Sequence, residues 1–117
     1  MKILVVDDDA SVREILLELL CSEGHEVQTA VDGKKALSIL QKHSFELIVS
    51  DIQMPQLDGI EFGRRFREVD IATPILFFSA VLCGLDAYAN EIKAIGNASF
   101  IENKNFDRLL SAIRETA

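Results

Sequence analysis

Short apolar runs alternate with segments of helical periodicity along the whole chain. Two continuous apolar runs are typical of strands that are covered on both faces: Ile3–Val6 and Leu47–Val49. Two further strands are expected at Ile75–Phe78 and Ala98–Ile101. The segment Glu26–Val31 instead alternates polar and apolar residues, with Val27, Thr29 and Val31 on one side. This alternation predicts a half-exposed strand at the edge of a sheet.

Capping signals mark where the intervening helices begin and end. The first helix opens with Ser11–Glu14, which has the form of a capping box with Ser11 as the cap, and it stops at Gly24. The pair Asp32–Gly33 marks a turn or a cap into the second helix, and Asp58 precedes the third helix as an acidic cap. Two more helices are expected, one over roughly residues 86–95 and one that contains Phe106, Leu109, Leu110 and Ile113.

Five strand–helix units in succession predict an α/β fold, a parallel sheet with helices on both faces. Right-handed crossovers and the half-exposed second strand favour the flavodoxin-like, doubly wound order 2-1-3-4-5. The length of 117 residues fits one domain over residues 1–117.

The net charge of −7 makes direct binding to nucleic acid or to an anionic membrane unfavourable. The arginines Arg64, Arg65 and Arg67 could form a local basic patch, but a solvated helix face is the preferred interpretation. No apolar stretch approaches the length of a membrane span. Cys21 and Cys83 match no disulfide or zinc pattern, which favours free thiols and a cytoplasmic location.

Acidic residues follow the first and third predicted strands, Asp7 and Asp8 after one and Asp51 after the other. In open parallel sheets, ligands bind beyond the carboxyl ends of the strands where the strand order reverses, which here is between these two strands. Three carboxylates that lie together repel one another strongly unless a cation or protons intervene, and oxygen ligands of this kind suit Mg²⁺. The alternative is that Asp7, Asp8 and Asp9 simply cap the first helix, but the expected cap at Ser11 disfavours it.

Ser79 ends the fourth strand and Lys104 follows the fifth, so both are expected at the same edge of the sheet as the acids. These groups suit a phosphoryl group in transfer, whose oxygens carry negative charge. The metal and the ammonium would neutralise that charge, and the hydroxyl would add a directed hydrogen bond. Taken alone, Ser79 is better explained as an ordinary serine at a strand end and Lys104 as a surface lysine, so their significance comes from the edge of the sheet that they share with the acids.

The chain resembles the receiver domain of two-component response regulators over essentially its whole length. The resemblance is strongest in Ile3–Asp9 and in Leu47–Gly59, which contains the family pattern Asp-x-x-Met-Pro-x-x-Asp-Gly in full. It implies that Asp51 takes a phosphoryl group from the phosphohistidine of a sensor histidine kinase or phosphotransfer protein. It also implies that Asp8 holds Mg²⁺ directly and Asp7 through water, with the backbone carbonyl of Gln53 as a further ligand.

The same resemblance implies a switch. Ser79 would be the hydroxyl that turns toward the phosphoryl group, and Phe100 the aromatic that moves with it. The fourth helix, fifth strand and fifth helix would then form the surface for a downstream protein or effector domain, with a phosphorylation-dependent dimer as one outcome. A domain of this kind is a phosphoacceptor rather than an enzyme, and at most catalyses its own phosphorylation and dephosphorylation.

The sequence departs from the family after the fifth strand, where Lys-Pro is usual. Asn103 stands where the lysine is expected and Lys104 where the proline is expected. Either a one-residue bulge lets Lys104 reach the site, or asparagine replaces the lysine. The segment Val81–Leu85 is also unusually apolar, which fits a partner contact or packing against its own helix equally well.

Two other functions stay open. One is a receiver-like interaction module that is phosphorylated poorly or not at all. The other is a phosphatase of the haloacid dehalogenase type, since Asp7–Ser11 loosely matches the nucleophile motif Asp-x-Asp-x-Thr, although no convincing downstream acidic pair follows. The chain is equally compatible with a complete single-domain regulator and with a receiver from a longer protein.

Overall fold

The computed structural model of the protein describes residues 1–79, 85–102 and 104–116. Within these residues it contains five strands, β1 (Lys2–Val6), β2 (Glu26–Ala30), β3 (Leu47–Ser50), β4 (Ile75–Ser79) and β5 (Ala98–Glu102). The helices that alternate with them are α1 (Ala10–Ser22), α2 (Gly33–Leu40), α3 (Gly59–Arg67), α4 (Leu85–Ile95) and α5 (Phe106–Thr116). The expectations for Asn103, for Cys83 and for most of the apolar segment 81–85 fall outside the described residues.

The five strands form one parallel sheet in the order β2-β1-β3-β4-β5, which confirms the predicted flavodoxin-like α/β fold. Val6 pairs with Ser50, and Ser50 pairs with Phe77, so β1, β3 and β4 end at nearly the same level. Residues that follow these strands are therefore brought to one edge of the sheet. No helix of the described part of the chain is long and apolar enough to span a bilayer.

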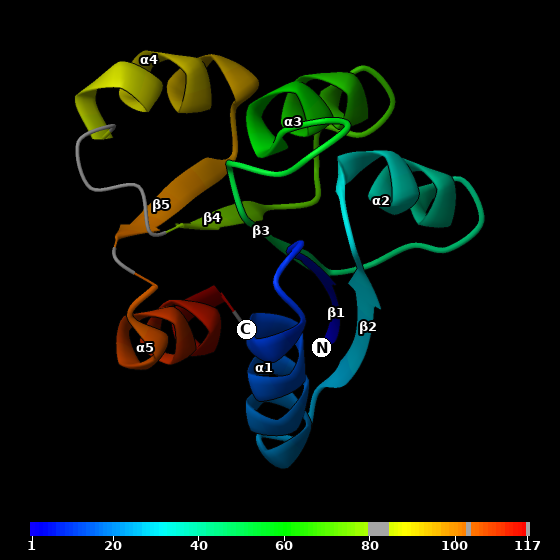
Figure 1. Ribbon diagram of the computed structural model, residues 1–117, viewed down its shortest axis with the longest axis vertical. Coiled ribbons are helices and arrows are strands. Elements are labelled where there is room, and N and C mark those ends of the chain that lie inside the picture. Colours follow the sequence, from blue (N-terminus) through cyan, green and yellow to red (C-terminus); the bar gives the residue numbers. More distant parts are fainter. Residues whose placement is uncertain (80–84, 103, 117) are drawn as a thin grey trace.

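Helices cover both faces of the sheet (Figure 1): α1 and α5 lie on one face, and α2, α3 and α4 on the other. On β1, Ile3 and Val5 belong to the hydrophobic core beside α1 and α5, whereas Leu4 and Val6 belong to the core beside α2, α3 and α4. Burial on both faces explains why the strand reads as an unbroken apolar run. Each such aliphatic side chain contributes about 1.5–3 kcal/mol by its removal from water.

The start of α1 differs from the sequence prediction. The N-cap is Asp9, whose side chain accepts a hydrogen bond of 2.9 Å from the Ser11 amide, so Ser11 already lies within the first turn. The predicted cap at Ser11 was therefore wrong by two residues. Asp9 is an equally good cap, and a hydrogen bond from its amide to the Asp7 side chain holds it in this position. One of the three successive acids is thus structural.

The edge strand β2 is half exposed as predicted, but it ends one residue early. Ala30 is buried and its carbonyl accepts the Asp7 amide, whereas Val31 is 48% exposed. The predicted alternation of buried and exposed residues does not extend to Val31, because the chain has already turned toward α2 at this point. Asp32 then caps α2 by accepting a hydrogen bond from the Lys35 amide.

The start of α3 is pressed against the end of β3. Asp58 caps α3 by accepting a 2.9 Å hydrogen bond from the Glu61 amide, as predicted. The Gly59 amide donates to the Ile52 carbonyl at 2.7 Å. A Cβ atom on Gly59 would lie 2.0 Å from the carbonyl oxygen of Asp51. The Asp-Gly pair of the motif thus lets α3 begin directly behind Asp51.

Of the three arginines of α3, two match the preferred interpretation and one does not. Arg64 and Arg65 are exposed and pair with Glu61 at 3.5 and 3.3 Å. Arg67 instead donates to the backbone carbonyls of Gly96, Asn97 and Asp70 at 3.0–3.1 Å. Its guanidinium is a tertiary link between the ends of α3 and α4 rather than part of a solvated face.

Candidate functional site

Three carboxylates gather at the carboxyl edge of the sheet, as the sequence predicted. Each of Asp7, Asp8 and Asp51 offers an oxygen, and these oxygens all lie within 4.8 Å of one another. Asp7 is 2% exposed and Asp51 7% exposed, whereas Asp8 is exposed to solvent. The cluster therefore has a buried floor of two acids and an open side at Asp8.

Backbone and side-chain hydrogen bonds hold Asp51 in one orientation. Its amide donates to the Val6 carbonyl at 2.8 Å, which extends the β1–β3 pairing by one residue. Its Oδ1 accepts the Ile52 amide at 2.7 Å. The buried Ser50 hydroxyl donates to its backbone carbonyl at 2.8 Å. These contacts leave Oδ2 directed toward the interior of the site.

The turn between β1 and α1 is tied together by a residue that sequence reasoning missed. Arg13 donates from Nη1 to the Asp7 carbonyl at 2.8 Å, and its own amide donates to the Asp9 carbonyl at 3.1 Å. Asp7 Oδ1 in turn accepts the Asp9 amide at 2.9 Å. The signal in the sequence is weak, because an arginine in the first turns of an exposed helix is common.

Lys104 reaches the acidic cluster. Its Nζ atom lies 3.0 Å from Asp7 Oδ2 and 3.3 Å from Asp51 Oδ2. Its backbone has a φ of +48°, which is unusual for a lysine, and its amide donates to the Ser79 carbonyl at 3.3 Å. The sequence left two alternatives: Lys104 reaches the site, or asparagine replaces the lysine. The structure agrees with the first, because the unusual backbone conformation of Lys104 after β5 places its ammonium beside the acids.

Burial and neighbouring charges act on the titration of this cluster. Burial raises the pKa of Asp7, and the nearby Asp51 carboxylate adds to the rise, while the Asp9 amide and the Lys104 ammonium oppose it. For Lys104, burial alone would lower the pKa, but the hydrogen bond to Asp7 and the charges of Asp51 and Asp7 together raise it. Lys104 is therefore a cation at neutral pH.

The donor set fits a hard divalent cation. Asp7, Asp8 and Asp51 offer only oxygen atoms, they converge within the distance that one ion bridges, and the open side at Asp8 leaves room for water. Mg²⁺ commonly binds through one or two carboxylates while keeping several waters. The residues present thus suit the cofactor that the sequence predicted.

The remaining predicted residues lie on three different parts of the fold. Ser79 is 1% exposed at the end of β4, two residues beyond the partner of Ser50. Gln53 is exposed in the loop between β3 and α3. Phe100 is half-buried on β5, where it packs against the core beside α4, and it lines a small cavity with Ala89 and Ile92. Phe100 is thus not part of the acidic cluster.

Comparison with known proteins agrees with this architecture. The family model of the response regulator receiver domain matches residues 3–114. The response regulator MprA of Mycolicibacterium vanbaalenii is 39% identical over 97 residues, which covers 78% of this chain and 42% of that protein. The sensor histidine kinase RcsC of Salmonella typhimurium is 38% identical over 80 residues, 68% of this chain and 8% of the kinase. The chain thus spans less than half of the length of these curated relatives.

Solved structures show the same fold. The chemotaxis response regulator CheY4 of Vibrio cholerae is similar with a TM-score of 0.88 and 34% identity, covering 99% of this chain and 98% of that one. The response regulator TrrA of Thermotoga maritima, determined in complex with Mg²⁺ and BeF, has a TM-score of 0.84 and 28% identity over 99% of this chain and 98% of its own. With the acidic cluster, the strand order and the family match in agreement, the chain belongs to the response regulator receiver family of two-component systems.

Proposed function

We propose that this domain accepts a phosphoryl group on Asp51 from the phosphohistidine of a sensor histidine kinase or phosphotransfer protein. The observation that carries the proposal is the convergence of Lys104, Asp7 and Asp51 at the carboxyl edge of the sheet. A buried carboxylate, a second acid and a fixed cation are the groups that phosphoryl transfer to an aspartate requires.

The transfer is a substitution at phosphorus. An oxygen of the Asp51 carboxylate attacks the phosphorus, the new P–O bond forms as the P–N bond to the donor imidazole breaks, and the imidazole nitrogen leaves with the electron pair. Because the Ile52 amide and the Ser50 hydroxyl fix Asp51, the carboxylate needs little reorganisation before it attacks. The Lys104 ammonium lies where it would neutralise charge on the phosphoryl oxygens.

Asp8, Asp51 and the backbone carbonyl of Gln53 would hold Mg²⁺ directly, with Asp7 bound through water. When bound, the ion supplies positive charge that stabilises the phosphoryl oxygens. The TrrA structure, a complex with Mg²⁺ and BeF, supports this choice of metal, because that protein shares the fold over nearly its whole length.

The response to phosphorylation would pass from Ser79 to Phe100. Ser79 lies on β4 and its carbonyl accepts the Lys104 amide, so a shift of the end of β4 would act on Lys104 in the loop after β5. Phe100 pairs with Phe77 across the same two strands and is only half-buried, which leaves it room to change position. The surface formed by α4, β5 and α5 would then bind a downstream protein or effector domain, or a second copy in a phosphorylation-dependent dimer.

Incubation with Mg²⁺ and acetyl phosphate, followed by intact mass measurement, tests the acceptor. The wild type is expected to gain one phosphoryl group and Asp51→Asn none. An equal gain in Asp51→Asn would overturn the assignment of Asp51. No gain in the wild type would instead favour the receiver-like interaction module.

The phosphatase alternative predicts a different response to substitution of the two acids Asp7 and Asp51. It requires multiple turnover that is lost in Asp7→Asn and kept in Asp51→Asn. We infer no such enzyme, because the match to the receiver family covers nearly the whole chain. The proposed reaction uses a donor phosphohistidine, and we expect it in the cytoplasm, where such kinases present that group.

A further inference from the structure

One arginine joins the carboxyl ends of α3 and α4. Arg67, the last residue of α3, donates from Nε to the Gly96 carbonyl and from Nη2 to the Asn97 carbonyl, each at 3.0 Å. Its Nη1 atom donates to the Asp70 carbonyl at 3.1 Å. Because α4 ends at Ile95, two of these three carbonyls belong to the turn that terminates α4. The guanidinium thus spans backbone groups that lie far apart in the sequence.

The turn after α4 is also tied to the start of β4. Gly96 and Asn97 have φ values of +79° and +48°, the left-handed conformation that commonly ends a helix. The Asn97 carbonyl accepts the Ile75 amide at 3.1 Å in addition to its bond from Arg67. The Asn97 side-chain amide donates to the Ala72 carbonyl at 2.8 Å. The end of α4 is therefore held both to α3 and to the loop that leads into β4.

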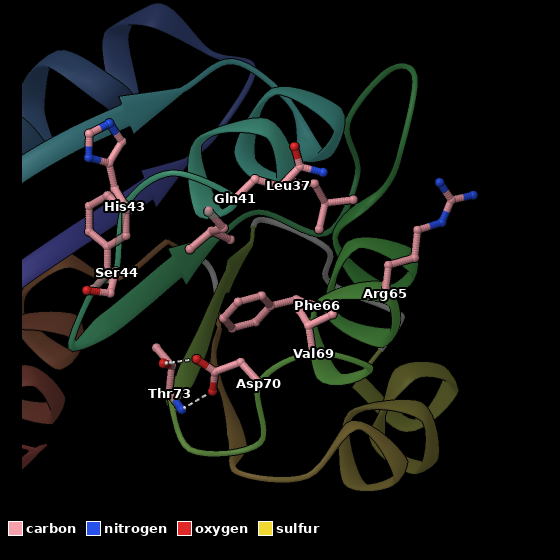
Figure 2. A pocket seen from close by; sticks show the side chains of 11 residues that line it. Leu37, Gln41, His43, Ser44, Arg65, Phe66, Val69, Asp70 and Thr73 are labelled. Atoms are coloured by element: carbon pink, nitrogen blue, oxygen red, sulfur yellow. Dashed lines mark hydrogen bonds between the residues drawn. The ribbon is translucent and has the colours of Figure 1, made fainter.

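That loop has hydrogen bonds of its own. The Asp70 carboxylate accepts the Ala72 amide at 2.8 Å and the Thr73 amide and hydroxyl at 2.9 Å. Figure 2 shows the two contacts between Asp70 and Thr73. The carbonyls of Asp70 and Ala72, which accept from Arg67 and Asn97, are thus presented by a turn that is fixed internally.

Packing between the helices acts at the same end of α4. The helices α3 and α4 lie side by side on one face of the sheet (Figure 1). A Cβ atom on Gly63 of α3 would lie 3.0 Å from Ile95 Cδ1, so the glycine leaves room for α4 to approach closely. Ile92 and Ile95 are each 7% exposed, and Arg64 pairs with Glu91 at 3.3 Å on the outer side. These contacts hold the part of α4 from Glu91 onward.

The acidic site lies at the other end of β4. Ile75 begins the strand beside the turn of Asn97, whereas Ser79 ends it, and the Ser79 carbonyl accepts the Lys104 amide. A change at the phosphoryl site would therefore reach β4 at the end opposite to Arg67. When one end of a packed helix is fixed and a displacement acts on the other, the helix turns about the fixed end.

We propose that Arg67 is a positioning residue that holds the carboxyl end of α4 against α3 in both the free and the phosphorylated protein. The helix α4 then responds to phosphorylation by pivoting about Gly96, not by moving as a whole. The pivot rests on the proposed function of Asp51, whereas the contacts of Arg67 do not depend on it. Because a contact that is equal in two states shifts no equilibrium between them, Arg67 stabilises α4 without changing the affinity for a phosphoryl mimic.

Hydrogen exchange without ligand tests the hold on α4. Arg67→Met should speed exchange of the amides of residues 92–97 by about tenfold, because local opening no longer breaks these hydrogen bonds. Arg65→Met, on the same helix, is the matched control and should exchange like the wild type. Arg65 pairs with Glu61 at 3.3 Å, and Figure 2 shows its guanidinium directed away from the turn of Asp70. Unchanged exchange in Arg67→Met would overturn the proposal.

Arg67→Lys is the milder variant. It keeps the positive charge but loses the planar fork that spans separate carbonyls, so an intermediate increase in exchange is expected. Full recovery of the wild-type exchange with lysine would contradict the role given to the three hydrogen bonds of Arg67.

Amide chemical shifts on addition of Mg²⁺ and beryllofluoride test the pivot. In the wild type the Ile52 amide and residues 88–90 should shift, and residues 93–97 should not. In Arg67→Met the shifts should extend through residue 97, while the affinity for beryllofluoride stays within about twofold of the wild type. Wild-type shifts at residues 93–97 as large as those at 88–90 would overturn the pivot. So would several-fold tighter binding by Arg67→Met, because it would show that the contacts open on activation.

The Ile52 amide separates a failure of the pivot from a failure of the proposed function. It donates to Asp51 Oδ1 and so reports on the acceptor itself. A wild type in which Ile52 does not respond to Mg²⁺ and beryllofluoride would overturn the proposed acceptor and the pivot with it. A response at Ile52 together with movement of residues 93–97 would leave the acceptor standing and overturn the pivot alone.

Discussion

The Lys104 ammonium lies 3.0 Å from Asp7 Oδ2, although 97 positions separate the two residues in the chain. The same Nζ atom lies 3.3 Å from Asp51 Oδ2, so one lysine from the loop after β5 bridges the acids that follow β1 and β3. Its position within the cluster makes Lys104 the residue whose removal most directly tests the chemistry of the site.

Replacing Lys104 with methionine should slow labelling of Asp51 by acetyl phosphate about a hundredfold. The change removes the fixed cation that would stabilise the phosphoryl oxygens, an effect comparable to the loss of one preorganised donor in an oxyanion site. The labelling rate at saturating Mg²⁺ is the measurement. Lys42→Met, at an exposed position outside the site, should react like the wild type. Equal rates for the two variants would mean that Lys104 has no part in the transfer.

Arg13 should tune the binding of Mg²⁺ without contacting it. Its guanidinium holds the carbonyl of Asp7 at 2.8 Å, and groups that orient metal ligands from behind commonly change affinity by about 10–100-fold. Arg13→Met is expected to weaken Mg²⁺ binding by about tenfold in calorimetry, and Arg13→Lys by less. The labelling rate of Asp51 should recover at saturating Mg²⁺. A lower melting temperature with unaltered Mg²⁺ affinity would instead assign Arg13 a purely structural role.

Gly59→Ala should destabilise the fold by about 2–3 kcal/mol, because the new methyl group would lie 2.0 Å from the Asp51 carbonyl oxygen and α3 would have to move. Gly63→Ala is the matched control on the same helix. There the nearest atoms belong to side chains, Ile95 Cδ1 at 3.0 Å and Phe77 Cζ at 3.3 Å, which can give by a few tenths of an ångström, and alanine gains up to about 1 kcal/mol in helix propensity. Urea unfolding of both variants should therefore show a large loss for the first and little or none for the second. Equal losses would refute the steric account.

Asp70 should make part of the stability pH-dependent. The Thr73 amide, with the Thr73 hydroxyl and the Ala72 amide, lowers the pKa of Asp70 below its ordinary value of 3.8. Its contribution is therefore present above that value and is lost as the pH falls through the lower folded-state pKa. Urea unfolding from about pH 6 down to about pH 3 should show a shallower loss of stability in Asp70→Asn than in the wild type. Parallel curves would show that Asp70 contributes nothing to the acid sensitivity.

The sequence alone was sufficient for the order of the elements and for the acidic half of the site. Apolar runs such as Ile3–Val6 are buried on both faces, and this requirement is visible locally as an unbroken run. The parallel topology then carries Asp7 and Asp51 to one edge, because both directly follow adjacent strands. Asp58 likewise caps α3 as expected, since a cap bonds an amide only three residues away.

Tertiary structure decided the features in which several local choices are equally good. Asp9 and Ser11 are both suitable caps for α1, and the contact of the Asp9 amide with Asp7 selects Asp9. Arg67 has the same local pattern as Arg64 and Arg65, yet the carbonyls of Gly96 and Asn97, 29 and 30 residues away, set its position.

Lys104 is the clearest case. Counting from Phe100 could not say whether it reaches the acids, because its place depends on a backbone φ of +48° that lysine rarely adopts. Two buried carboxylates, each far from Lys104 in the sequence, offset that cost by their attraction for the ammonium, and their combined field exists only in the assembled fold. The acids of this site could thus be read from their own strands, whereas the cation that completes it is positioned by the fold.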